Sequence, residues 1–84
     1  KGIICTDLKT DQNLILSELR KGYPVVVSVR RGIFTYGGHF IVLTGIDDED
    51  NITMNDPMSI EHSSRTWKLS EFSDQIKNTW SFHI

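Results

Sequence analysis

The chain has 84 residues, a formal net charge of −2 and a single cysteine. This length predicts one small domain with a limited core. One cysteine excludes an internal disulfide and a multi-thiolate zinc site. There is no basic stripe for a phosphate backbone and no apolar run near the ~20 residues that span a bilayer. We therefore expect a globular domain with no nucleic-acid partner and no membrane segment in this chain.

The N-terminal part of the chain predicts a strand followed by a helix. Residues 3–6 are short and apolar, which is typical of an edge strand. Thr10 and Asp11 are both good N-caps, and the leucines and isoleucine of residues 14–19 supply an apolar helical face. Gly22 follows two basic residues and indicates the end of the helix.

The middle of the chain predicts three strands. Residues 24–29 are rich in β-branched side chains, and Pro24 prevents the preceding helix from continuing into them. Residues 39–46 form the second strong apolar segment. Residues 52–55 alternate apolar and polar, as a half-buried strand does. The charged residues 47–51 between them predict a turn.

The C-terminal part predicts shorter elements. Residues 58–64 are interpreted as a polar loop, residues 65–69 as a short strand, and residues 70–77 as a helix capped by its serine. Residues 80–84 alternate and predict a final strand. Short connections between the central strands favour antiparallel pairing, so the predicted fold class is α+β, with residues 1–84 as a single domain.

A candidate site lies where the two strands of the central hairpin are farthest from their turn. If the turn is centred near Asp48 and Glu49, His39 lies opposite about residue 58. A turn one residue earlier, or a bulge, would place Asp56 itself opposite His39. In either case the two side chains are within about two residues of opposition. Neighbours of this kind are about 5–8 Å apart at Cβ, so the carboxylate can accept a ring N–H.

This pair of residue types suits nucleophilic catalysis. A carboxylate holds an imidazole in one tautomer and orientation, and the imidazole can then take the proton of a nearby thiol. The glycines at 37 and 38 leave room for a substrate backbone. The alternative is structural: a histidine and an aspartate on neighbouring strands also form simple structural hydrogen bonds, and two glycines also form simple turns.

Three segments in this order resemble a known family. They are GYPVVVSV at 22–29, GHFIVLTG at 38–45 and MNDP at 54–57, and WKLSEF at 67–72 also fits. The sequence resembles the bacterial bacteriocin-processing (double-glycine-leader) peptidases and their peptidase-like relatives, which are papain-like cysteine peptidases. The resemblance extends from about Thr10 to Trp80. It implies a papain-like fold of which this chain is the antiparallel β-sheet half, with one or two short helices.

The resemblance also implies roles for individual residues. His39 corresponds to the general base and Asp56 to the residue that orients it. The family's nucleophilic cysteine lies on a helix upstream and follows a glutamine of the oxyanion hole, and this sequence contains neither segment. We therefore expect the chain to be the C-terminal part of a larger peptidase-like domain, inactive by itself, with a peptide or protein substrate. The resemblance allows an extracellular or cell-envelope location and leaves the compartment open.

The other candidate residues favour structural roles. Cys5 precedes the first helix instead of opening one, and Gln12 follows it in the wrong order, so we expect Cys5 to be a structural, partly buried thiol. His62, in the predicted loop, and His83 lack metal-ligand spacing with His39. The acidic turn lacks the ligand pattern of an EF-hand. We expect no metal and no cofactor.

Three hypotheses remain open at the level of sequence. The chain is the base-bearing part of a cysteine peptidase, a related module that binds peptides without cutting them, or a small structural domain with a vestigial histidine and aspartate. A peptide-binding module would accept an extended chain, for instance by strand addition. If an upstream half is missing, Phe34, Tyr36 and Phe40 are candidates for an exposed apolar face that would cause self-association.

Overall fold

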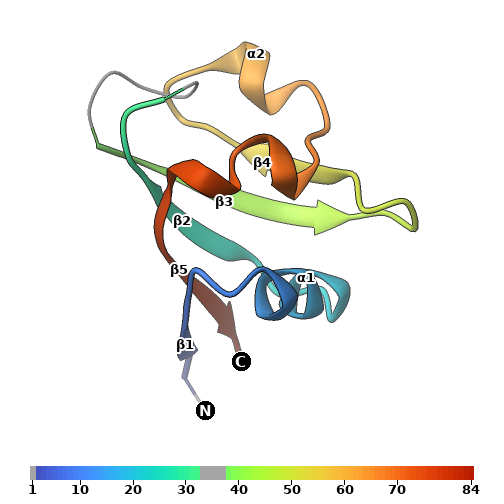
Figure 1. Cartoon of the computed structure of the whole chain (residues 1–84). Helices are drawn as coiled ribbons and strands as arrows, with labels where there is room; N and C mark the ends of the chain where they lie inside the picture. Colours follow the sequence, from blue (N-terminus) through green and yellow to red (C-terminus); the bar gives the residue numbers. More distant parts are fainter. Residues whose placement is uncertain (1, 33–37) are drawn as a thin grey trace.

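The computed structural model describes residues 2–32 and 38–84 of the chain, and these residues form an antiparallel sheet with helices on one side (Figure 1). The sheet has five strands in the order β1-β5-β2-β3-β4. Every pairing is antiparallel, so the predicted α+β class is confirmed. The strands are β1 (Ile4–Lys9), β2 (Val25–Val29), β3 (His39–Ile46), β4 (Ile52–Asn55) and β5 (Ile76–His83).

Helix α1 (Gln12–Arg20) begins and ends as the sequence indicates. Asp11 is the N-cap, and its side chain accepts a hydrogen bond from the Leu14 backbone N–H at 3.1 Å. The chain leaves the helix through Gly22, whose φ of 88° is readily adopted only by glycine. Ile15 and Leu19 are buried against the sheet.

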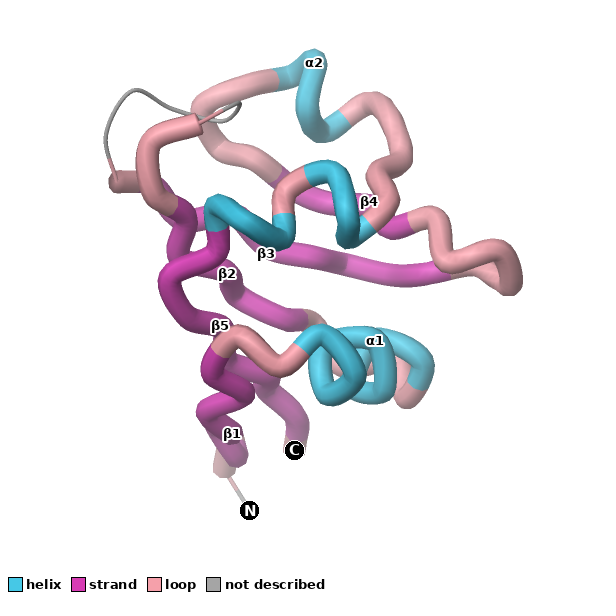
Figure 2. Tube along the Cα trace, in the orientation of Figure 1, coloured by secondary structure: helices cyan, strands magenta, loops and turns pink. Residues whose placement is uncertain are grey.

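One face of the sheet carries the core. Figure 2 shows α1 and two short 3-10 helices, η1 (Leu69–Glu71) and η2 (Ser73–Gln75), on the same side of the strands. Because side chains alternate along a strand, every second residue of β2 and β3 faces this layer. The core consists of Leu8, Ile15, Leu19, Val25, Val27, Val29, Ile41, Leu43, Ile52, Met54, Trp67, Leu69, Phe72 and Ile76.

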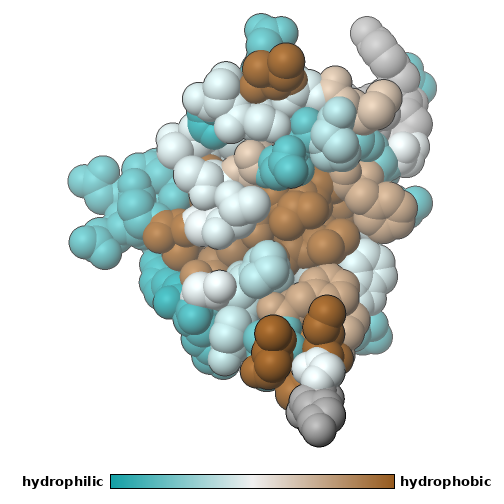
Figure 3. Space-filling view, turned by 180° about the vertical axis from the view of Figure 1, so that it is seen from behind, coloured by the Kyte–Doolittle hydropathy of each residue, from teal (hydrophilic) through white to brown (hydrophobic). Residues whose placement is uncertain are grey.

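Among residues 2–32 and 38–84, no helix covers the other face of the sheet, away from α1, and this face is called the open face. Figure 3 shows apolar side chains gathered across its middle. The alternation of β2, β3 and β5 assigns to this open face Val26, Phe40, Val42, Trp80 and Phe82. The Phe40 side chain is 58% exposed, and its ring centroid lies 6.5 Å from that of Trp80. Phe34 and Tyr36, which were expected on the same surface, lie outside the described residues.

The C-terminal third differs from the sequence-based expectation. Residues 60–63, predicted as loop, form the four-residue helix α2 (Ile60–Ser63). Residues 65–69 contribute only a single bridge, between Trp67 and Ile52, instead of a strand. The helix predicted at 70–77 is replaced by η1 and η2, because β5 already begins at Ile76 and pairs with β2. Long-range pairing therefore outweighs the local helical pattern.

No helix within residues 2–32 and 38–84 is long and apolar enough to cross a membrane.

Candidate active site around Asp56

His39 and Asp56 come together at the end of the β3–β4 hairpin farthest from its turn. Val42 pairs with Asn55, so the next residue, Asp56, lies level with Ile41. His39 precedes Ile41 by two residues and therefore lies on the same, core-facing side of the sheet. The two side chains meet as diagonal neighbours, at the offset of two residues that the hairpin geometry predicts.

The contact between the two side chains is short and shielded from solvent. His39 Nε2 lies 2.6 Å from Asp56 Oδ1, and the side chains are 11% and 0% exposed, respectively. Among the described residues, the other ring nitrogen of His39, Nδ1, has no hydrogen-bonding partner. One ring nitrogen of His39 is thus held by the carboxylate.

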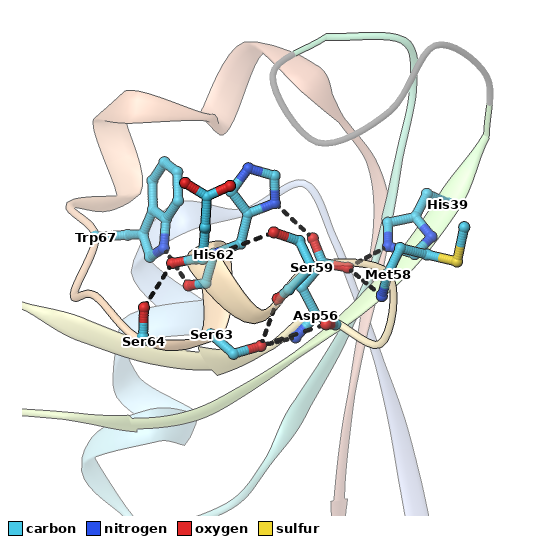
Figure 4. Close-up of polar contacts among 9 residues, drawn as sticks. His39, Asp56, Met58, Ser59, His62, Ser63, Ser64 and Trp67 are labelled. Carbon is cyan, nitrogen blue, oxygen red and sulfur yellow. Dashed lines mark hydrogen bonds and ion pairs between the residues drawn. The ribbon is translucent and has the colours of Figure 1, made fainter.

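Two further donors complete the environment of the Asp56 carboxylate (Figure 4). The Met58 backbone N–H donates to Oδ1 at 2.9 Å. His62 Nδ1 lies 2.8 Å from Oδ2, and the His62 side chain is 24% exposed. A buried carboxylate requires such partners, because an unpaired charge is costly in a protein interior. His62, interpreted from sequence as a weak candidate in a loop, is therefore part of the site.

The segment after Asp56 folds back so that His62 reaches the carboxylate. Ser59 is the N-cap of α2 and accepts a hydrogen bond from the His62 backbone N–H at 3.0 Å. The Ser63 hydroxyl accepts a hydrogen bond from the Asp56 backbone N–H at 2.9 Å and closes the loop. A capping serine three residues before the histidine and two residues after Pro57 was the sequence signal for this short helix.

The pKa of Asp56 lies below its ordinary value. Burial raises this pKa, but the hydrogen bonds from His39, His62 and the Met58 N–H together outweigh burial and lower it. Asp56 is thus an anion at neutral pH. An ionised carboxylate only accepts hydrogen bonds, so both histidine rings must present a proton to it.

Cys5 lies far from this site and is exposed, so the expectation of a partly buried thiol is wrong. The reason is that β1 is an edge strand and Cys5 points away from the core. It pairs with Phe82 near the Val25 end of β2, whereas His39 pairs with Val29 at the other end. Three strand spacings of about 4.8 Å and five residues of about 3.3 Å separate Cys5 and His39 by about 20 Å. They also lie on opposite faces of the sheet.

The other polar candidates have local roles in the structure. Asp47 accepts hydrogen bonds from the backbone N–H groups of Glu49 and Asn51, both at 2.9 Å, which closes the acidic turn. The ring of His83 stacks on Tyr23 with centroids 4.4 Å apart. Gln12 is exposed at the start of α1. In the described part of the chain, no group of three or more histidine, cysteine or acidic residues is arranged to hold a metal ion.

Comparison with known proteins agrees with this geometry. The model of the Peptidase_C39 like family matches residues 3–82. The chain belongs to the Peptidase_C39 like family. The chain is therefore a peptidase-like domain. Because this family is papain-like, the predicted α+β, papain-like fold class is confirmed. No curated protein and no solved structure gives a significant match.

Proposed function

We propose that this member of the Peptidase_C39 like family provides the general base of a cysteine peptidase site. In this proposal His39 is the base, Asp56 orients it, and a segment outside this chain supplies the nucleophilic cysteine and an oxyanion-hole glutamine. Residues 1–84 are then the C-terminal part of a larger peptidase domain. The observation that carries the proposal is the 2.6 Å contact between His39 Nε2 and the buried Asp56 carboxylate.

In this proposal the proton passes from the thiol to the leaving group through His39. His39 donates Nε2–H to Asp56, which leaves the lone pair on Nδ1 to take the proton of the cysteine thiol. The thiolate attacks the carbonyl carbon of the peptide bond, and the imidazolium returns the proton to the leaving amine, forming an acyl-thioester. Water then attacks the thioester, giving one proton to His39, which passes it to the departing thiolate sulfur. The overall reaction is the hydrolysis of one peptide bond by one water molecule, and it requires no cofactor.

Replacing the base in the longer natural protein that contains these residues tests the proposal. We expect His39→Ala to lower kcat/KM for peptide cleavage by about 10²–10⁴-fold, because general-base catalysis is lost. His83→Ala is the matched control, since His83 stacks on Tyr23 away from the site, and should retain activity. Cleavage by His39→Ala at the wild-type rate would refute the proposal.

A second candidate function is peptide binding without cleavage. A surface hollow of about 650 Å³ lies beside Asp56, and Met58 and Ile60, which line it, are 77% and 88% exposed. Exposed apolar side chains beside a polar pocket are typical of a peptide-binding surface. Measurable peptide affinity that survives in His39→Ala and is lost in Met58→Ser, with no cleavage by the wild type, would favour this function.

A further inference from the structure

The Asp56 carboxylate lies between two histidine rings and divides its oxygens between them. Oδ1 accepts from His39 at 2.6 Å and from the Met58 N–H at 2.9 Å. Oδ2 is 2.8 Å from His62 Nδ1, and His62 is its donor among the described residues. Because the side chain of Asp56 is 0% exposed, removing His62 would deprive a buried anionic oxygen of that donor.

The orientation of the His62 ring is built by several contacts from separate elements. Its backbone N–H is capped by Ser59, and its carbonyl accepts the Trp67 indole N–H at 3.0 Å. The ring also makes an edge contact with the Trp67 ring, with centroids 5.6 Å apart and an interplanar angle of 72°. Trp67 is itself buried and bridged to Ile52 of β4. The core thus fixes the direction from which His62 approaches the carboxylate.

The shared anion assigns opposite tautomers to the two rings. An ionised carboxylate has no proton to donate, so His39 must carry its proton on Nε2 and His62 on Nδ1. Free neutral imidazole favours Nε2–H. The Nδ1–H form of His62 is therefore a specific consequence of its contact with Asp56.

We propose that His62 is a positioning residue of the site: it holds the second oxygen of Asp56, so that the first oxygen faces His39 and one buried anion serves two histidines. The catalytic role of His62 in this inference rests on the proposed function. The contacts of Asp56 with His39 and His62 do not depend on it.

The remaining charged groups around His62 are exposed or have a partner of their own. Glu61 lies on the same helix and is exposed. Arg65 lies over the Trp67 ring, 3.7 Å from its centroid, and pairs with Glu71 at 2.9 Å. Among the described residues, Asp56 is the charged side chain in direct contact with both histidine rings.

The first experiment reads the tautomers directly. Long-range ¹H–¹⁵N NMR spectra of the histidine rings in the 84-residue chain, recorded at a pH where both are neutral, should show His39 protonated on Nε2 and His62 on Nδ1. His83 contacts no aspartate or glutamate side chain among the described residues, so its ring signals should be the same in Asp56→Asn as in the wild type. In Asp56→Asn the Nδ1–H pattern of His62 should disappear. An Nε2–H pattern for His62 in the wild type would overturn the proposal.

The second experiment separates the hydrogen bond from packing. His62→Phe keeps an aromatic ring beside Trp67 but removes the donor, whereas His62→Asn places an N–H near the position of Nδ1. We expect His62→Phe to shift the ¹H and ¹⁵N ring signals of His39, because the Asp56 carboxylate loses the contact that orients it. His62→Asn should retain the wild-type ring signals of His39. Unchanged His39 ring signals in His62→Phe, or identical behaviour of the two variants, would overturn the proposal.

These readouts do not depend on peptide cleavage. If His39→Ala in the longer protein cleaves normally but the tautomers are as expected, the proposed function fails and the positioning contact stands. If cleavage requires His39 but His62 carries its proton on Nε2, the positioning role fails and the proposed function stands. A lower kcat for peptide cleavage with an unchanged KM in His62→Phe would show that the positioning contact supports the proposed activity.

Discussion

At the scale of single residues, the site depends on the burial of one carboxylate. Asp56 follows β4 directly, and its side chain is completely buried. Burial alone would raise its pKa, but three hydrogen-bond donors keep its pKa below the ordinary value. Each of these donors therefore contributes to the fold and to the site at the same time.

The lowered pKa of Asp56 predicts how stability depends on pH. A carboxyl with a lower pKa in the folded state contributes stability that is full above its unfolded pKa of about 3.9 and is lost as pH falls through the folded pKa. We expect Asp56→Asn to lower the free energy of unfolding by about 2 kcal/mol at pH 7. This difference should shrink below about pH 4. Urea titrations at pH 7, 4 and 3 test this, and a difference that stays constant with pH would contradict it.

The position of Cys5 predicts an ordinary thiol. It is exposed and about 20 Å from His39, so the imidazole cannot activate it. We expect the rate of labelling with a cysteine-directed electrophile, followed by mass spectrometry at several pH values, to be independent of His39. It should be identical in wild type and His39→Ala. Fast labelling at neutral pH that is lost in His39→Ala would mean that the chain carries its own thiolate–imidazole pair.

At the scale of elements, α1 is tied to the sheet by a polar contact as well as by apolar packing. The Ser81 hydroxyl, buried in β5, donates to Glu18 Oε1 at 2.7 Å, and Lys21 Nζ lies 2.9 Å from Glu18 Oε2. This contact joins residues far apart in the sequence. It fixes the rotation of α1 about its own axis in a small core.

Removing this link should destabilise the domain. We expect Ser81→Ala to lower the free energy of unfolding by about 1–2 kcal/mol, because a buried carboxylate oxygen loses its donor. Ser70→Ala, at an exposed position in η1, is the matched control. Thermal or urea unfolding measures both. Equal stabilities of the two variants would show that the Ser81 contact contributes nothing.

The loop between α1 and β2 predicts a glycine-specific effect. Gly22 has a φ of 88°, and an added methyl group would meet no atom within 4 Å. The strain caused by alanine would therefore lie in the backbone conformation alone. We expect Gly22→Ala to cost about 1 kcal/mol of stability. Gly38→Ala is the control, since Gly38 has comparable space without a positive φ. Its unfolding free energy should not fall. Equal losses in both variants would contradict this assignment.

At the scale of the whole molecule, the described residues cover the sheet on one face only. Figure 3 shows apolar side chains gathered on the open face. The rings of Phe40 and Trp80 lie on this face, with their centroids 6.5 Å apart. In a chain of this size an uncovered apolar face is a surface that other protein surfaces can bury. Under the proposal that residues 1–84 are part of a larger peptidase domain, this face is a candidate for contact with the rest of that domain.

This exposure predicts self-association of the isolated chain. We expect the sedimentation coefficient to rise with concentration, because association buries apolar surface. Phe40→Ser should weaken the effect without loss of folding, since Phe40 is 58% exposed. Met58→Ser, at another exposed apolar position, is the control. A monomer at all concentrations in analytical ultracentrifugation would contradict the prediction.

The sequence alone predicted the local elements and the central hairpin. The β-branched run at 24–29, the capping residue Asp11 and the acidic turn each encode a local conformation, and all three are observed. The diagonal meeting of His39 and Asp56 followed from the hairpin register alone. These features were predictable because they depend on contacts between nearby segments.

Only the tertiary structure decided the rest. The extension of β5 to Ile76 depends on pairing with β2, and the exposure of Cys5 depends on which strand forms the edge of the sheet. The role of His62 depends on Trp67 and on a four-residue helix too short to have a periodic pattern. In each case the free energy of long-range pairing and burial outweighs local propensity, and a linear sequence does not display those partners.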